Sequence, residues 1–513
     1  MSPISNLKIR IQKQTLPLTQ PAKNSDGVAG SPPAQMPLTS IEHFHLLSGS
    51  SAHPNVLFCR VIISGTLHQK LLNEAMGQVL NRHFLINRRL AKSSQRPTWI
   101  NDPNCQTIPL TSLQVLDDRP LDASFIPIAQ DLETKLNLNS TCGTHVWYLP
   151  LVSTATQPNS QEVAQTHAAA KSMLFFAIHH SVTDGLGGSR VINEILIAYD
   201  NLVAGRAWDD GFRRLAPARL SQRNRLGLNR WDYWKHLWKQ PIALAGMAKF
   251  LFRGFHVIKG GQAKACGTPN IESDSQTLGL RGRWISEDLS AQIDRSAAEK
   301  SISANSIAMA SVFYALPTWS RQLSDTPVEK WFRMVLPISI ASKNDLRSPI
   351  TNRATIVQID RCEDQMRDVD SFLHYLDREV KIIVGWQFDK LFLLLIRMMS
   401  VSRGWLRRSA ANPRARGTIV FTNLGQPFRS VDKRLQKLSG AAANADHLTD
   451  VVDFDYAGPI RSGMPLNFTI QRHQQRYRIT ARFDGRVLTT DQADRFLDQV
   501  ETEMNKITSR PPA

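Results

Sequence analysis

The chain has 513 residues, which is enough for several domains or for two large lobes with their own cores. Hydrophobic residues make up 42% and charged residues 21%, a composition that is ordinary for a globular protein. Lysine and arginine total 62 against 44 aspartates and glutamates, so the net charge is +18 and anionic partners are favoured. Phosphate-bearing co-substrates, an acidic carrier protein, an anionic membrane and nucleic acid all meet that description.

The five cysteines argue against two classes of small domain. Their number is odd and no CxxC pair occurs, so neither a zinc ribbon nor a disulfide framework is predicted. This usage indicates a reducing compartment, and we expect a cytoplasmic protein. The longest apolar run, "LFLLLI" (Leu391–Ile396), is followed by Arg397 and is far shorter than the roughly 20 residues that span a bilayer.

The N-terminal part of the sequence predicts a tail followed by an α/β lobe. Residues 1–36 are basic and rich in Pro, Gln, Ser and Gly, which is typical of a disordered tail. Residues 37–205 alternate apolar, β-branched runs with segments of helical spacing, and form the predicted first lobe. Strands are expected at "NVLFCRVIISG", "HVWYLPLV" and "SMLFFAIHH", and helices at "TLHQKLLNEAMGQVLNRH" and "SRVINEILIAYDNLVAG".

The rest of the sequence predicts a connector and a second lobe of the same mixed character. Residues 206–275 are basic and aromatic and form the expected connector, and residues 276–513 form the second lobe. A buried helix is expected over Ser301–Leu316, and a final helix with its N-cap at Thr490 or Asp491. Strands are expected near 276–288 and at "KWFRMVLPISI", "NRATIVQID" and "GTIVFTNLG", with a hairpin at "PLNFTIQRHQQRYRITARFDG".

The stretch "FFAIHHSVTDGLGG" carries the strongest chemical signal. It places His179 and His180 at the end of a predicted strand, where successive side chains point to opposite faces. The two rings therefore do not converge on one ion, and with no third ligand nearby we expect no metal. Neutral imidazole accepts a proton near pH 7, so one histidine could be a general base. The residues alone leave a second alternative open, a core histidine bonded to a main-chain carbonyl.

The surrounding sequence resembles the acyl-CoA-dependent acyltransferase superfamily that carries an HHxxxDG motif. That superfamily includes chloramphenicol acetyltransferase, the condensation domains of nonribosomal peptide synthetases and the wax ester synthase/diacylglycerol acyltransferases. His179, His180, Asp184 and Gly185 match the motif, in the expected place between a strand and a helix. Weaker similarities follow in family order at "LTSIEHFHLL", "VLNRHFLINRRL", "DGLGGSRVINEI", "MVLPISIASKNDLRSPITNRATIVQI" and "IVFTNLG".

The resemblance implies an α/β fold of two similar lobes that form a V, with an active-site tunnel at their interface. It implies that His180 is the general base, that Asp184 fixes the loop by pairing with an arginine, and that Gly185 allows close backbone approach. His179 would be a supporting residue that points away from the tunnel. Candidates for substrate or oxyanion contacts, carried over in the same way, are Thr422, Asn423, Asn352 and Ser339.

The sequence departs from the family pattern at arginine positions. Asn87 stands where the family has an arginine, and Ala341 follows the strand that normally ends in one. The partner of Asp184 is therefore open between Arg88, Arg190 and Arg353.

By this resemblance the protein is an acyltransferase that moves an acyl group from a thioester to a hydroxyl or amine of a hydrophobic acceptor. The acceptor attacks the thioester directly, without an acyl-enzyme. Acyl-CoA or the phosphopantetheine of an acyl carrier protein is the expected co-substrate, and no permanently bound cofactor is expected. The alternative is a condensation-domain-like protein that docks a carrier protein with little or no turnover.

The positive charge also raises the question of an anionic membrane or nucleic acid as partner. Trp231–Lys259 and Phe388–Arg408 combine aromatic or apolar residues with basic ones, and they predict either packing within the protein or contact with an anionic membrane surface. No nucleic-acid-binding motif occurs and the basic residues are spread along the whole chain, so no nucleic-acid partner is expected.

Overall fold

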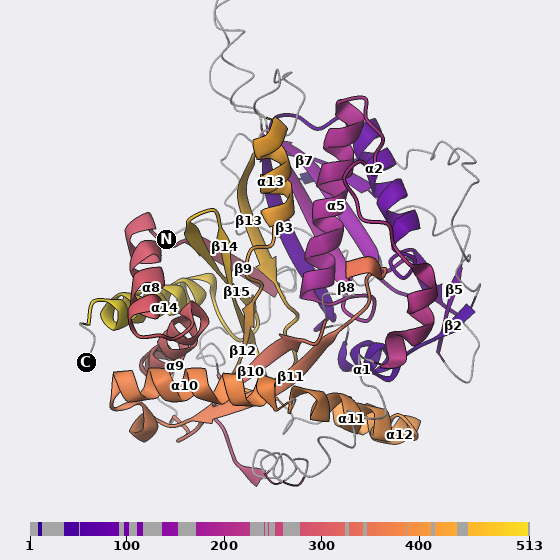
Figure 1. The fold of residues 1–513 in the computed structure, drawn as a ribbon. Helices are drawn as coiled ribbons and strands as arrows, with labels where there is room; N and C mark the ends of the chain where they lie inside the picture. The colour runs from indigo at the N-terminus through magenta and orange to yellow at the C-terminus, as the bar shows by residue number, and fades with distance from the viewer. Residues whose placement is uncertain are drawn as a thin grey trace, which may run out of the picture.

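The computed structural model describes most of the two predicted lobes. The described residues are 9–12, 35–50, 52–91, 97–101, 110–115, 136–151, 171–225, 241, 245, 252–259, 278–323, 328–341, 346–386, 388–411, 416–438 and 450–510. Figure 1 shows two sheet-based lobes, with the indigo and magenta N-terminal elements in one and most of the orange and yellow C-terminal elements in the other. The predicted mixed α/β class is confirmed.

The first lobe is built on a six-stranded sheet with the order β1-β6-β7-β8-β3-β13. Its strands are β1 (Ile9–Gln12), β3 (Val56–Ser64), β6 (Leu110–Val115), β7 (Thr144–Leu151), β8 (Lys171–His179) and β13 (Val451–Ala457). All neighbours are antiparallel except β6 and β7, which run parallel. A smaller sheet, β2-β5-β4, consists of β2 (Gln35–Pro37), β4 (Arg88–Leu90) and β5 (Thr98–Asn101).

Helices α2 (Gln69–Arg82) and α5 (Gly185–Val203) cover one face of the first sheet. Their apolar stripes pack on alternate residues of the strands, as amphipathic helices do on a half-buried sheet. Val79 of α2, Ile195 of α5 and Phe176 of β8 belong to this one core. A second cluster, with Phe58, Trp147 and Phe175, lies on strand residues of the opposite parity and so covers the other face.

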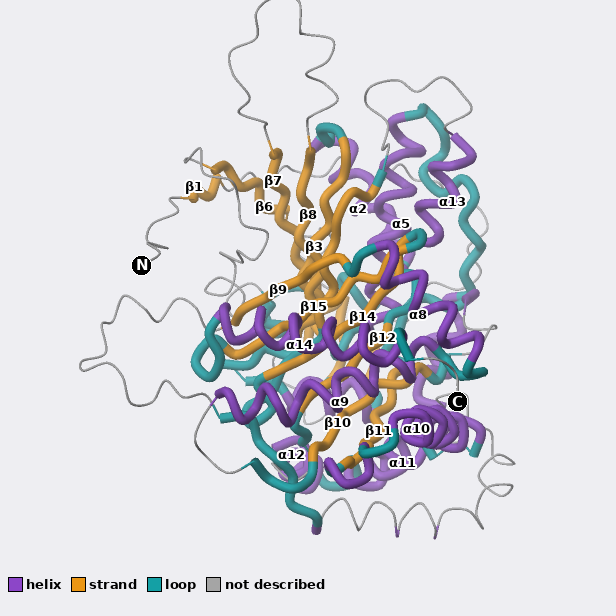
Figure 2. Tube along the Cα trace, turned by 90° about the vertical axis from the view of Figure 1, so that its left-hand side faces the viewer, coloured by secondary structure: helices purple, strands orange, loops and turns teal. Residues whose placement is uncertain are grey.

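The second lobe is built on a sheet with the order β11-β10-β12-β14-β15-β9. Its strands are β9 (Leu278–Trp284), β10 (Phe332–Ser339), β11 (Ala354–Arg361), β12 (Ile419–Asn423), β14 (Leu466–His473) and β15 (Arg476–Asp484). Its helices are α8 (Glu287–Glu299), α9 (Ala304–Leu323), α10 (Val369–Gly385) and α14 (Thr490–Thr508). Figure 2 shows α9 and α14 crossing the strands of this sheet.

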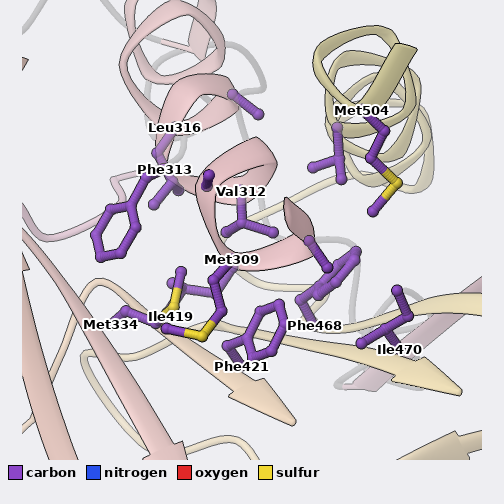
Figure 3. Packing of buried hydrophobic residues seen from close by; sticks show 14 of the residues in the cluster. Met309, Val312, Phe313, Leu316, Met334, Ile419, Phe421, Phe468, Ile470 and Met504 are labelled. Carbon is purple, nitrogen blue, oxygen red and sulfur yellow. The ribbon is translucent and has the colours of Figure 1, made fainter. Parts of the chain in front are cut away.

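The core of the second lobe lies between α9, α14 and the sheet. Figure 3 shows Met309 and Phe313 of α9 and Met504 of α14 above strand residues that include Phe421 and Phe468. The indole of Trp319 also donates to the main-chain oxygen of Gln492 over 2.9 Å, which ties α9 to the start of α14.

Strand β13 crosses from the second lobe to the first. It follows β12 and α13 (Arg429–Leu438) in the chain, yet it pairs with β3 at the edge of the first sheet, as Figure 1 shows. The buried carboxylate of Asp455 on β13 accepts from Arg60 Nε of β3 (2.8 Å) and from Arg478 Nε of β15 (3.1 Å). This ion cluster joins strands of both sheets, so the lobe boundary in space does not follow the predicted chain boundary at residue 276.

Helix α1 (Ser40–Ser48) lies at the junction of the lobes. A capping box at its start pairs Thr39 with Glu42. Its apolar residues, including Phe44, pack against α11 (Asp389–Met399) and α12 (Arg403–Ala411). Two elements of the C-terminal part of the chain therefore fix a helix from the N-terminal part.

Several boundaries differ from the sequence prediction. Within the predicted tail of residues 1–36, Ile9–Gln12 pair with β6 and Gln35 and Met36 belong to β2, and the rest of residues 1–34 lies outside the described residues. Helix α5 begins at Gly185 because Asp184 caps it, so the glycines lie in its first turn. The cap of α14 is Thr489, which shares a capping box with Gln492. Most of the connector 206–275 is also outside the described residues, and within the described part no helix is long and apolar enough to cross a membrane.

Candidate active site

His179 and His180 lie where β8 ends. His179 is the last residue of the strand and its N–H donates to the Gly143 carbonyl (2.8 Å), on the side of β7. His180 begins the turn, and its N–H donates to the Asn55 carbonyl (2.8 Å), on the side of β3. Consecutive N–H groups thus point to opposite neighbours, as in an extended strand, and this alternation sends the two rings in different directions.

The hydrogen bonds of His180 fix which ring nitrogen carries the proton. Nδ1 lies 3.0 Å from the main-chain oxygen of Thr183, and a carbonyl oxygen can only accept, so Nδ1 is the protonated nitrogen. Nε2 of the neutral ring then keeps its lone pair, and no other described residue makes a hydrogen bond to it. The half-buried His180 therefore presents a proton acceptor in the form that general-base chemistry requires.

Asn352, which precedes β11 of the second sheet, holds His180 from the other lobe. Its Nδ2 donates to the main-chain oxygen of His180 (2.7 Å) and also lies 3.0 Å from His180 Nδ1. The amide orientation is set by Ala354, whose N–H donates to Asn352 Oδ1 (3.1 Å). Since Nδ1 donates to Thr183, the carbonyl of His180 is the acceptor that Asn352 uses.

His45 of helix α1 stacks on His180. The two ring centroids are 4.1 Å apart and the planes differ by 18°. Nδ2 of Asn55 donates to the main-chain oxygen of His45 (2.7 Å), and the carbonyl of the same asparagine receives the His180 N–H. One residue at the start of β3 thus positions both rings.

Burial and mutual proximity keep these imidazoles neutral. Burial lowers the pKa of His180 to about 4, against the effect of its bond to Thr183, and the positive charge of Arg461 adds to the lowering. Burial also lowers the pKa of His179 to about 3, and it lowers that of His45 well below its ordinary value. Burial disfavours the charged form at each of these positions, so neutral rings are the stable form near pH 7.

Asp184 has a structural role. Its Oδ1 accepts from the Gly187 N–H (2.8 Å) as the N-cap of α5, and its Oδ2 accepts from the main-chain N–H of Arg353 (2.7 Å). Burial raises the pKa of Asp184, while these two bonds oppose the shift. Of the three arginine candidates, Arg353 is thus the one that contacts Asp184, and the contact that the structure defines is through its backbone. Arg190 instead donates to Glu194 (2.9 Å).

Gly185 lies at a contact between α5 and the residues around β12 and β13. A Cβ atom there would come within 2.8 Å of Leu424 Cδ2, just beyond β12, and its carbonyl accepts from the Tyr456 hydroxyl of β13 (2.9 Å). A side chain at this position would therefore displace the Leu424 side chain.

The remaining predicted residues lie at the ends of three strands, β12, β10 and β8. Thr422 is half-buried on β12, two residues before Leu424, and so belongs to the strand end that meets α5. Asn423 donates to Asn305 of α9 (2.9 Å) and accepts from the Gly425 N–H (2.7 Å), which commits it to a turn. Ser339 is exposed at the end of β10, where its hydroxyl accepts from the Ala341 N–H. His179 bonds only locally, with Nδ1 2.7 Å from the Ser181 hydroxyl.

Sequence reasoning missed three members of the site: His45, Asn55 and Arg461. His45 and Asn55 are far from the motif in the chain, and Arg461 lies in the turn between β13 and β14. No spacing rule links them to His180, because packing of α1 and the crossing of β13 bring them there. Among the described residues, no group of three or more His, Cys, Asp or Glu side chains could hold a metal ion.

Comparison with known proteins gives the fold. No family model matches the chain, and no curated protein sequence matches it significantly. Solved structures do match across nearly the whole chain. The TRI3 trichothecene 15-O-acetyltransferase from Fusarium sporotrichioides is similar at a TM-score of 0.62 and 11% identity, covering 93% of this chain and 96% of that one.

Two condensation domains are similar to the same extent. The first condensation domain of the calcium-dependent antibiotic synthetase, in complex with a substrate analogue, gives a TM-score of 0.60 at 13% identity over 94% of this chain and 98% of that one. The starter condensation domain of rhizomide synthetase, in complex with C8-CoA and Leu-SNAC, gives 0.57 at 11% identity over 93% and 95%. The chain thus has the fold of the condensation domains and chloramphenicol acetyltransferase-like enzymes that the HHxxxDG resemblance implied.

Proposed function

We propose that this protein is an acyltransferase that moves an acyl group from a thioester to the hydroxyl or amine of an acceptor, with His180 as general base. The proposal rests on the tautomer of His180. Its Nδ1–H is bound to the Thr183 carbonyl, so Nε2 has a free lone pair. The fold supports the same chemistry, since its structural neighbours include an O-acetyltransferase and a condensation domain bound to C8-CoA.

The proposed reaction has two proton transfers and no acyl-enzyme. The acceptor O–H or N–H donates to His180 Nε2, and the proton passes to that nitrogen as the acceptor atom bonds to the thioester carbon. When the tetrahedral intermediate collapses, the C–S bond breaks and the leaving thiolate takes the proton back from Nε2. The Thr183 carbonyl stabilises the transient imidazolium through Nδ1. The Thr422 hydroxyl and the Gly185 amide are the proposed oxyanion donors.

The test is acyl transfer from a panel of acyl-CoAs to long-chain alcohols and amines by wild type and His180→Ala. Loss of a general base costs about 10² to 10⁴-fold in rate. His374→Ala is the matched control, because that histidine is exposed on α10 and should leave turnover unchanged. Equal rates for wild type and His180→Ala would refute the role of His180.

Two further measurements separate the mechanism from its alternatives. Intact mass spectrometry after incubation with acyl-CoA should show no adduct, and a stable acylated protein would contradict direct attack. Complex formation with an acyl carrier protein, without product from any donor, would favour the carrier-docking alternative. The condensation domains among the structural neighbours make this the relevant competitor.

We also propose that the surface formed by the end of α11 and the start of α12 contacts an anionic membrane. Met398, Val401 and Trp405 are 61%, 90% and 64% exposed. Arg397, Arg407 and Arg408 are exposed beside them. Apolar groups flanked by cations are the combination that binds anionic bilayers. Because α11 and α12 pack on α1, which carries His45, this surface lies on the elements that support the site.

Vesicle co-sedimentation tests the membrane contact. Wild type should bind phosphatidylcholine vesicles that contain phosphatidylglycerol, and the double variant Val401→Asp/Trp405→Ser should bind on the order of tenfold more weakly. Val452→Ser, an exposed apolar change on β13, serves as the control. Equal binding by the double variant and wild type would contradict the contact.

A further inference from the structure

Arg461 is held in a fixed position by the tight turn between β13 and β14. The Met464 N–H donates to its carbonyl (2.9 Å), and Gly463 adopts a φ of +75° to close the turn. A side chain at Gly463 would also come within 3.0 Å of Arg416 Nη1, so the turn packs against a second guanidinium. The position of Arg461 is therefore built into the backbone.

The half-buried guanidinium of Arg461 has only weak interaction partners. Its Cζ lies 5.4 Å from the centre of the Phe44 ring, and Nη2 is 3.3 Å from the Ser48 hydroxyl. No carboxylate of the described residues lies within ion-pair distance of it. Its charge is disfavoured there, because burial and the nearby Arg416 lower its pKa to about 10.

Three buried arginines of this protein have carboxylate or main-chain acceptors. Arg60 pairs with Asp455, and Arg333 pairs with Asp360 over 2.7 Å. Arg482 has no carboxylate partner among the described residues and donates to the main-chain oxygens of Val56 (2.6 Å) and Gly458 (3.0 Å), while its Nε and Nη2 have no partner there. Arg461 is half-buried and has neither kind of partner within the described part of the chain, so its cation is open to an external anion.

Arg461 belongs to the site by contact. The Phe44 ring that it covers lies 5.7 Å from the His45 ring, which in turn stacks on His180. The hydroxyl of Ser48 accepts from Asn55 Nδ2 (2.9 Å), the residue whose carbonyl holds the His180 N–H. The positive charge of Arg461 also lowers the pKa of both imidazoles, which places it within electrostatic reach of the base.

We propose that Arg461 binds a carboxylate group of the substrate, at a point linked to His180 by the ring contacts of Phe44 and His45. This inference rests on the proposed acyl transfer and names a substrate class for it: a hydroxy or amino acid as acceptor, or a dicarboxylic acyl thioester as donor. A guanidinium matches a carboxylate with two parallel N–H···O bonds, which gives orientation as well as affinity. The partners in the free protein are weak enough for a carboxylate to displace.

Binding of a carboxylate would also strengthen the base. In the free protein Arg461 contributes to the low pKa of His180. An anion on the guanidinium offsets that charge, so the pKa of His180 rises when the substrate binds and moves closer to the working pH. A substrate without a carboxylate would leave His180 a weaker base, so the protein would select its substrates partly by their charge.

Calorimetric binding of 12-hydroxydodecanoate and of its methyl ester tests the acceptor arm, and binding of succinyl-CoA and acetyl-CoA tests the donor arm. For whichever pair of ligands contains the natural carboxylate, wild type should bind the acid more tightly than the neutral ligand. Arg461→Gln should weaken binding of the acid about 10- to 100-fold and change binding of the neutral ligand little. Arg461→Lys should recover part of the affinity, and Arg367→Gln, at an exposed arginine, is the control.

The outcomes are distinct. A selective loss in either arm supports the carboxylate site and identifies its source. Equal losses for acid and neutral ligand, or no loss in either arm by a variant whose thermal unfolding matches wild type, overturn it. Because binding is measured without turnover, a protein that discriminates the acids but transfers no acyl group would refute the proposed function and leave this site intact.

Discussion

The ion cluster around Asp455 and the histidine site around His180 are both buried at the junction of the lobes, yet their charges are handled in opposite ways. Asp455 accepts from arginines on β3 and β15, and although burial alone would raise its pKa, Arg478 and Arg60 bring it below the ordinary value. At the histidine site the rings are neutral, and Arg461, in the turn that follows β13, lacks a carboxylate among the described residues. The charge of Asp455 is thus paired within the fold, whereas the charge of Arg461 has no carboxylate partner among the described residues.

Removing the paired carboxylate should have the largest effect on stability. Asp455→Ala leaves Arg60 and Arg478 buried without their partner, and breaking a buried pair in this way costs about 3 to 5 kcal/mol. Urea denaturation followed by fluorescence measures the change. Arg461→Gln, at the unpaired cation, should be nearly neutral or stabilising, because it removes a charge that burial disfavours.

Asp364→Ala controls for the loss of any ion pair, because its partner Arg367 is exposed, and it should cost no more than about 1 kcal/mol. The contrast between the two regions would fail if Asp455→Ala and Arg461→Gln had similar free energies of unfolding.

Acid should destabilise the histidine site before it affects the ion cluster. The folded-state pKa values of about 4 for His180 and about 3 for His179 lie below the ordinary value, so the unfolded chain binds more protons as the pH falls through about 6.5. Stability is therefore fully present above about pH 6.5 and is lost towards pH 4, at about 1.4 kcal/mol per pH unit for each proton.

Urea denaturation at pH 7, 6 and 5 checks this slope. His180→Gln should reduce it, whereas His374→Gln, at an exposed position, should not. The same pKa sets the acid limb of kcat/KM, which we expect near pH 4 for the free enzyme instead of near 6.5. A slope that His180→Gln leaves unchanged would contradict a neutral, buried imidazole at this position.

The smallest expected effect concerns positioning across the lobes. Asn352→Ala removes the bond to the His180 carbonyl, and loss of one such hydrogen bond corresponds to about a tenfold decrease in kcat. KM should change less than kcat, because Asn352 orients the base and does not touch the acceptor. Asn505→Ala on the exposed face of α14 is the control. If Asn352→Ala changed the free energy of unfolding but not kcat, the role of Asn352 in positioning His180 would be contradicted.

Local patterns predicted the part of the site that is continuous in the chain. The apolar run before His179 forms β8, the glycine-rich turn begins α5, and the hairpin of β14 and β15 forms as expected. These features depend on residues a few positions apart, which periodicity and capping rules describe.

The rest of the site depends on contacts between distant segments. His45 reaches His180 because α11 and α12 pack on α1, and Arg461 reaches the site because β13 crosses to β3. The sequence predicts an arginine side chain as the partner of Asp184, whereas in the structure the main-chain N–H of Arg353 donates to it. A single sequence contains no pattern for such contacts, since any residue can supply a main-chain N–H.

The crossing of β13 has a consequence for the order in which the protein forms during synthesis. The edge of β3 is made before the second lobe, but β13, the strand that covers it, emerges only after the elements from β9 to α13. Until then the edge offers unpaired N–H and C=O groups to other chains, and Arg60 lies there without Asp455. The nascent first lobe is therefore the stage at which a molecular chaperone would matter most.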